Sequence, residues 1–186
     1  TNLFYRTFND VNRQRSNNTV ITVVVSPILG LKSTRYPDVN YAPGPDSGFI
    51  GCALTPHPSY GVQVFVPGDD TRLRVGDVLR LSWVGYASPN GNLSHVIGGS
   101  EGEWDSPPLT LEWVQNGYPF TVPFNPHVSL PGLVKPDDYP HKPIYGSATT
   151  SYKVIRGGVT VGGSNPSLVL VTLIRPNNAP PCIAPD

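Results

Sequence analysis

Two cysteines, Cys52 and Cys182, are the first candidates for chemistry in this sequence. Neither belongs to a CxxC motif or stands beside clustered histidines, so the sequence offers little support for a metal site or a redox motif. We favour a structural disulfide. Pairing within one chain would close a loop of about 130 residues and stabilise the fold by roughly 4–5 kcal/mol in the chain-entropy model. Pairing between two chains and two free buried thiols are the alternatives.

Residues for catalysis are present only as scattered side chains. Histidines occur in Pro- or Gly-rich segments, at positions 57, 95, 127 and 141, and no serine lies in a GxSxG motif. A hydrolase needs a nucleophile, a base and a group that orients the base. The pairs Asp69-Asp70 and Asp137-Asp138 lack the EF-hand spacing of a calcium site. We therefore expect no enzyme activity, no cofactor and no metal.

Aromatic residues close to acids and amides provide a candidate carbohydrate site. A sugar-binding surface needs exposed rings beside groups that hydrogen-bond hydroxyls. The candidate ligand-binding residues are Trp104, Tyr118, Asp137, Asp138 and Tyr139, with Tyr145 and Asn116 near them. The simpler alternative is that these rings pack onto the rim of the protein.

Composition indicates that strands position all of these residues. The 22 Pro and 19 Gly among 186 residues disfavour long helices, because Pro lacks the N–H donor and Gly costs backbone entropy. Thirteen basic and 13 acidic residues give zero net charge, which argues against binding nucleic acid through phosphates. No apolar run reaches the roughly 18–20 residues that span a membrane. The remaining class is an all-β, turn-rich protein.

Alternating apolar and polar residues mark the individual strands. Strands are predicted over residues 61–66, 78–84, 109–114, 118–122, 149–156, 159–161 and 167–174. Leu79, Leu81 and Trp83 share one face of the second strand, and we expect the same of Leu109, Leu111 and Trp113 in the third. Pro119 places the fourth strand at a sheet edge. Gly157-Gly158 suits a two-residue hairpin turn, and residues 123–143 read as a loop with room for one short helical turn.

The N-terminal region resembles the last strand of the chain. Residues 16–27 read SNNTVITVVVSP, and residues 164–176 read SNPSLVLVTLIRP. Residues 3–26 are therefore predicted to copy the final hairpin, although chance similarity of Val-rich strands is the alternative. A lone hairpin is only marginally stable in water, so we expect this one to cover its own sandwich or to complete a sheet in another molecule. The predicted subunit-interface residues are Thr19, Val20, Ile21, Thr22, Val23, Val24 and Val25.

The core resembles the bacterial immunoglobulin-like repeats of large secreted and surface proteins. The resemblance lies in GVQVFVPGDDTRLRVGDVLRLSWVGY at 61–86, YPFTVPF at 118–124 and GSATTSYKVIRGGVTVGGSNPSLVLVTL at 146–173. It implies an extracellular, immunoglobulin-like antiparallel β-sandwich with Trp83 in its core and no catalytic activity. The predicted domain division is a hairpin extension at 1–30, a linker at 31–49, the sandwich at 50–176 and a tail at 177–186.

These observations favour a non-enzymatic, secreted structural subunit that assembles head-to-tail into an extracellular fibre by strand or hairpin complementation. Donor and acceptor surfaces would differ, and contacts of that kind propagate as filaments. The alternative is an adhesin or lectin-like carbohydrate-binding domain of a larger repeat protein, with a glycan or cell-surface partner. A secreted toxin or a phage-associated decoration domain is a third interpretation, because sandwiches host many functions.

Overall fold

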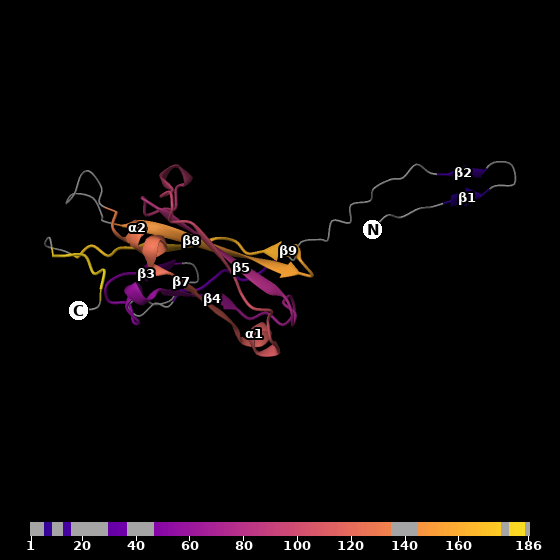
Figure 1. The fold of residues 1–186 in the computed structure, drawn as a ribbon, viewed down its shortest axis with the longest axis horizontal. Helices are drawn as coiled ribbons and strands as arrows, with labels where there is room; N and C mark the ends of the chain where they lie inside the picture. The colour runs from indigo at the N-terminus through magenta and orange to yellow at the C-terminus, as the bar shows by residue number, and fades with distance from the viewer. Residues whose placement is uncertain are drawn as a thin grey trace.

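The computed structural model describes residues 6–8, 13–15, 30–36, 47–134, 145–175 and 179–184. Most of the regular structure is β-strand, with two short α-helices, and this confirms the predicted all-β class. A large sheet and a small sheet face each other in a sandwich-like arrangement (Figure 1).

The large sheet contains most of the strands. In spatial order they are β3 (Ser47–Ile50), β10 (Ser167–Val171), β8 (Gly146–Arg156), β5 (Val78–Tyr86) and β6 (Gly102–Asp105), and β9 (Val159–Gly163) also pairs with β8. The small sheet pairs β4 (Val62–Pro67) with β7 (Gly117–Val122), and a bridge between Arg35 and Phe65 adds the segment 30–36. The expected antiparallel arrangement holds for every described strand pair except β3 with β10, which run parallel.

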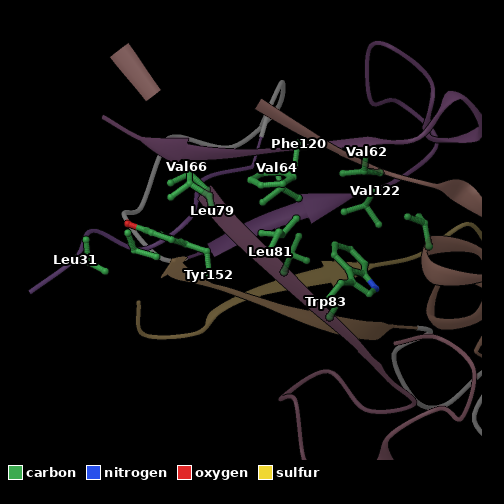
Figure 2. Packing of buried hydrophobic residues seen from close by; sticks show 14 of the residues in the cluster. Leu31, Val62, Val64, Val66, Leu79, Leu81, Trp83, Phe120, Val122 and Tyr152 are labelled. Atoms are coloured by element: carbon green, nitrogen blue, oxygen red, sulfur yellow. The ribbon is translucent and has the colours of Figure 1, made fainter. Parts of the chain in front are cut away.

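The core lies between the two sheets. Leu79, Leu81 and Trp83 of β5 are buried, as their alternation predicts. They face Val62, Val64, Val66, Phe120 and Val122 of the small sheet (Figure 2). Trp83 also donates from Nε1 to the His127 carbonyl at 3.1 Å, so its polar atom is satisfied. The β5 pattern therefore identifies both the strand and the face that it buries.

The predicted hairpin at residues 149–163 forms between β8 and β9. Gly157 and Gly158 have φ angles of 58° and 80°, which lie in the left-handed region that glycine adopts at little cost. The two-residue turn brings Val159 opposite Arg156. The dipeptide therefore sets the register of this hairpin.

The prediction of a strand over 109–114 is wrong. Residues Leu111–Asn116 form the helix α1, whose first turn is capped by Thr110 Oγ1 accepting from the Trp113 N–H at 3.3 Å. Leu109 and Val114 are buried while Leu111 is exposed, so the apolar residues follow helical rather than strand spacing. Trp113 is half-buried against the core. Thr110, a favoured N-cap residue, is the signal that would have identified the helix.

Short helical segments complete the connections. The predicted loop 123–143 contains the helical turn η3 (Phe124–Val128) and the helix α2 (Ser129–Gly132), which confirms the expected helical turn. Two further turns are η1 (Pro58–Tyr60) and η2 (Leu93–His95). No helix among the described residues combines the length and hydrophobicity needed to cross a membrane.

The predicted linker 31–49 contributes to both sheets. Besides β3 in the large sheet, the segment 30–36 holds a buried hydroxyl cluster against β8 and β10. Thr150 Oγ1 lies 2.6 Å from both Thr34 Oγ1 and Tyr36 Oη, and Tyr36 Oη donates to the Ser167 carbonyl at 2.9 Å. Burial raises the pKa of Tyr36 although its hydrogen bonds with the threonines act to lower it. The cluster therefore joins the two sheets through neutral polar groups.

Near the N-terminus, β1 (Arg6–Phe8) and β2 (Arg13–Arg15) pair antiparallel, with Arg6 opposite Arg15. Thr19–Val25, the predicted subunit-interface strand, lies outside the described residues. Its role therefore stays a prediction.

Candidate functional site

The described strands run between two chemically different ends of the sandwich. The strand β8 shows this best, because Gly146 packs against Pro131 of α2 while Arg156 bonds to Asp77. We call the first the α2 end and the second the entry end. The name refers to Gly30, where the chain enters the sandwich. Gly30 lies at this end because a side chain added there would meet the Arg72 guanidinium.

A buried carboxylate organises the entry end. Asp77 is 1% exposed, and its two oxygens accept from Arg156 Nε at 2.7 Å and Nη2 at 2.8 Å. The Arg74 N–H donates to Asp77 Oδ2 at 2.9 Å, and Arg156 Nη2 also reaches the Arg72 carbonyl at 3.1 Å. Two-point pairing of this kind is the strong form of an arginine–carboxylate bond. It fixes the end of β8 to the loop that precedes β5.

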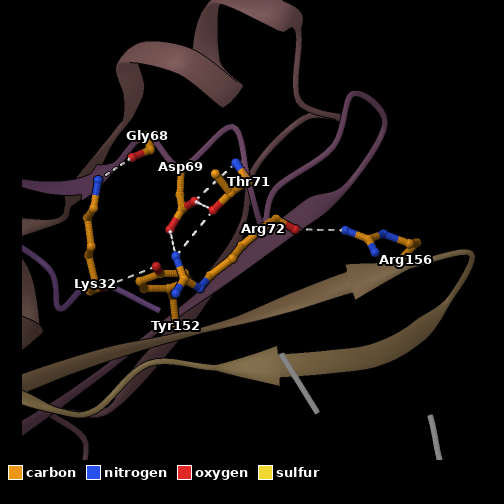
Figure 3. A network of polar contacts seen from close by, with 7 residues as sticks. All are labelled: Lys32, Gly68, Asp69, Thr71, Arg72, Tyr152 and Arg156. Atoms are coloured by element: carbon orange, nitrogen blue, oxygen red, sulfur yellow. Dashed lines mark hydrogen bonds and ion pairs between the residues drawn. The ribbon is translucent and has the colours of Figure 1, made fainter. Parts of the chain in front are cut away.

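A second carboxylate, Asp69, is connected to Arg156 through Arg72 (Figure 3). Its oxygens accept from Thr71 Oγ1 at 2.7 Å, from the Thr71 N–H at 3.2 Å and from Arg72 Nη1 at 3.0 Å. Burial acts to raise the pKa of Asp69, but these hydrogen bonds and the charge of Arg72 together hold the pKa below its ordinary value. Asp69 is therefore an ionised turn residue.

Tyr152 connects the same network to the segment 30–36. Its hydroxyl donates to the Lys32 carbonyl at 3.0 Å, and Lys32 Nζ donates to the Gly68 carbonyl at 3.0 Å (Figure 3). Burial, reinforced by the negative charge of Asp69, raises the pKa of Tyr152. The phenol is neutral and its proton is engaged, so these groups hold the strands together and are not poised to react.

The α2 end is closed by the predicted disulfide. Cys52 and Cys182 are joined within one chain, across a sequence separation of 130 residues, which excludes the alternatives of an interchain bond and of free thiols. The Cys182 N–H donates to the Leu173 carbonyl at 2.9 Å, and the Leu173 N–H donates to the Gly132 carbonyl at 2.7 Å. The C-terminal segment is thus held against α2. Disulfides of this kind persist in oxidising compartments.

The candidate interaction site is the edge of β3 that has no partner strand among the described residues. β3 pairs with β10 on one side. Ile50 is fully buried, while Phe49 is half-buried and contacts the ring of Tyr145 edge-on, with centroids 6.0 Å apart. Sequence reasoning missed this strand because its four residues are too few to show a period. The available signal was a Phe-Ile pair separated from Cys52 by one glycine.

Compared with the other described edges, β3 is the least protected against pairing with a further strand. β6 carries Glu103 and Asp105, β7 carries Pro119, and β9 pairs with β8 through a register shift. Charges, prolines and bulges are the devices with which proteins prevent edge-to-edge pairing. The sequence of β3, Ser-Gly-Phe-Ile, contains no charge and no proline.

Two of the predicted ligand-binding residues lie on different sheets. Trp104 of β6 is half-buried and contacts the His127 ring edge-on at 4.9 Å. Tyr118 of β7 is half-buried and contacts both Trp113 and Phe120, at 4.9 and 4.8 Å. Both rings pack against the core. The other predicted ligand-binding residues, Asp137, Asp138 and Tyr139, lie outside the described residues, so the carbohydrate site stays a prediction.

The described residues provide little support for a catalytic site. His57 Nδ1 lies 2.8 Å from Ser59 Oγ, and His95 Nδ1 lies 3.1 Å from Ser94 Oγ, but each pair belongs to a single turn. A hydrogen-bonded acid to orient the imidazole, which a triad requires, is found at neither histidine in this part of the chain. Nor do three His, Cys, Asp or Glu side chains come together there in a way that would hold a metal ion.

Comparison with known proteins finds no family model, no curated protein and no solved structure that matches this chain. The functional argument therefore rests on the sequence and on the geometry of the two ends.

Proposed function

We propose that the protein is a non-enzymatic, extracellular structural subunit built on an immunoglobulin-like sandwich. Copies assemble head-to-tail into a fibre when the segment Thr19–Val25 of one copy adds as a strand to a sheet edge of the next. The observation that carries the proposal is the edge of β3 opposite β10, which has no partner strand among the described residues and lacks the charges, prolines and bulges of the other described edges. Strand addition supplies main-chain hydrogen bonds at such an edge.

The positions of donor and acceptor support a head-to-tail arrangement. The 29 residues before Gly30 join the sandwich at the entry end. β3 instead leads toward the α2 end, because Ile50 is level with Val171, which pairs with Gly146. Fully extended, the 11 residues from Thr19 to Leu29 reach about 36–40 Å beyond Gly30, which is similar to the roughly 36 Å that the 11 residues of β8 span. The donor segment is therefore long enough to reach a neighbour that lies in line.

Contacts between different surfaces repeat without closing, which produces a filament. Zero net charge places no long-range repulsion between identical copies. The disulfide fits an extracellular location, since such bonds form in oxidising compartments.

Negative-stain electron microscopy of the purified chain tests this function. We expect fibres from the native protein and none from Val23→Asp, because a charge on the apolar face of the donated strand opposes its burial. Asn18→Asp introduces the same charge just before the predicted strand and is expected to leave the fibres intact. A native protein that stays monomeric at all concentrations would overturn the proposal, and glycan binding by that monomer would instead support the carbohydrate-binding alternative.

A further inference from the structure

Exposed large apolar side chains of the described residues gather at the two ends of the sandwich. They lie in loops, in short helices or at the end of a strand. Isolated apolar residues on a surface need no explanation. Their restriction to the two ends does need an explanation, because strands, loops and turns all have solvent-exposed positions. The two ends, and not the outer faces of the sheets, are therefore the surfaces where association would bury the most exposed apolar area.

At the entry end the exposed residues are Val75, Leu111 and Val159, which are 63%, 61% and 55% exposed. They sit on three segments that the structure ties together. The Gly76 N–H donates to the Leu109 carbonyl at 2.9 Å, which joins the Val75 loop to the start of α1. The Asp77–Arg156 pair joins the same loop to the β8–β9 hairpin. We call these three residues the entry-end trio.

The α2 end carries Tyr60, Leu93, Val96 and Tyr145 among its exposed apolar residues. The three that lie on or beside α2 and Cys182 are Leu130, Leu133 and Ile183, which are 38%, 37% and 54% exposed. They too are placed by hydrogen bonds. Leu133 follows Gly132, Ile183 follows Cys182, and Leu173 bonds to both Gly132 and Cys182. We call these residues the α2-end trio. Each end therefore presents apolar side chains on a backbone that is held in place.

We infer that the entry-end trio of one copy packs against the α2-end trio of the next. The inference rests on the proposed head-to-tail assembly and adds to it a second contact, made by the sandwich itself. The occupant is a second copy of this chain because the N-terminal segment leaves from Gly30, at the entry end. When β3 of the next copy receives that segment, the α2 end of that copy comes to face the entry end of the donor. The two trios belong to different surfaces, so the contact propagates as strand donation does.

Crosslinking between copies tests this contact in the full chain. Leu111→Cys and Leu133→Cys each place one reactive thiol at one end, while the native cysteines are bonded to each other. With a short bismaleimide, a mixture of the two variants is expected to give crosslinked dimers, and a chain with both substitutions is expected to give a ladder. The mixture should yield at least about tenfold more dimer than either variant alone, because a fixed contact gives a high effective concentration.

Gln63→Cys is the matched control, since Gln63 is exposed on β4, on the outer face of the small sheet. It should crosslink poorly with either variant. The pair Val75→Cys and Ile183→Cys repeats the test with independent substitutions.

Fibres without the mixed crosslink in either pair would overturn this inference and leave the proposed function standing. A dimer formed equally well by Leu133→Cys alone would also overturn it, because that contact joins two identical ends. Failure of the native chain to assemble at all would overturn the proposed function itself.

Discussion

The two ends of the sandwich are closed by different means. At the entry end, Asp77 and Asp69 hold arginines and backbone groups through charge-assisted hydrogen bonds. At the α2 end, a covalent bond between Cys52 and Cys182 holds the C-terminal segment against the sheet. The first closure depends on the charges of these side chains and on their burial. The second depends on the redox state of the surroundings.

This difference indicates which conditions weaken each end. A bond between distant residues acts mainly on the unfolded chain, so its contribution grows with the loop that it closes. A buried ion pair acts in the folded state, where its value depends on how completely solvent is excluded. The following changes test that contrast, beginning with the one from which we expect the largest effect.

Loss of the disulfide should have the largest effect. The double variant Cys52→Ala/Cys182→Ala is expected to lower the free energy of unfolding by about 5 kcal/mol, because the closed loop spans some 130 residues. Guanidinium unfolding of both proteins measures the difference. A reducing agent should shift the native midpoint but not that of the variant. Equal midpoints for the two oxidised proteins would show that the α2 end does not depend on this bond.

Removal of the arginine at the entry end comes next. Arg156→Met leaves the Asp77 carboxylate buried without its two-point partner, which should cost about 3–5 kcal/mol of unfolding free energy. Urea unfolding measures the loss. Adding Asp77→Asn to this variant removes the stranded charge and should recover part of the stability. No recovery in the double variant would mean that lost packing, rather than the unpaired charge, causes the loss.

Acid should act on the entry end through Asp69. The pKa of this carboxyl is lowered in the folded state, so its contribution is present above the ordinary value near 4 and is lost as the pH falls through the folded-state pKa. Asp69→Asn should therefore be less stable than the native protein at pH 7 and show a shallower loss of stability below about pH 4. Urea midpoints measured across that range test this. Parallel curves would exclude Asp69 as a source of the acid sensitivity.

The smallest effect is expected from Arg80→Ala. Arg80 and Asp105 also form a two-point pair, at 2.7 Å for both bonds, but their side chains are 41% and 45% exposed. Solvent screens an exposed pair, and ordering two side chains offsets its attraction. We expect no resolvable change in the urea midpoint under the conditions used for Arg156→Met. A comparable loss in both variants would show that burial is not what distinguishes the two pairs.

Local patterns in the sequence were sufficient for much of the fold. The alternation of Leu79, Leu81 and Trp83 predicted both β5 and its buried face, because a strand turns successive side chains to opposite sides. Gly157-Gly158 predicted the β8–β9 turn, since its positive φ angles favour glycine. The same kind of pattern failed at 109–114, where a few apolar residues fit a strand or a helix and the Thr110 cap selects the helix.

The candidate site was harder to predict, because its features depend on residues far apart in the chain. The edge at β3 exists only through its pairing with β10, some 120 residues later. The Asp77–Arg156 pair spans 79 residues, and the local sequence around either residue does not identify its partner. The sequence restricted the disulfide to Cys52 and Cys182 because no other cysteines exist. Chain geometry then decided that the bond lies within one molecule.

By itself, therefore, the sequence determined the all-β class, most of the strands and the absence of a charge excess, because these follow from periodicity and composition. Only the tertiary structure decided which strands form the edges, which carboxylates are buried and which apolar side chains are left at the two ends. Burial and pairing are set by contacts between distant segments, and a pattern that is read along the chain does not contain them.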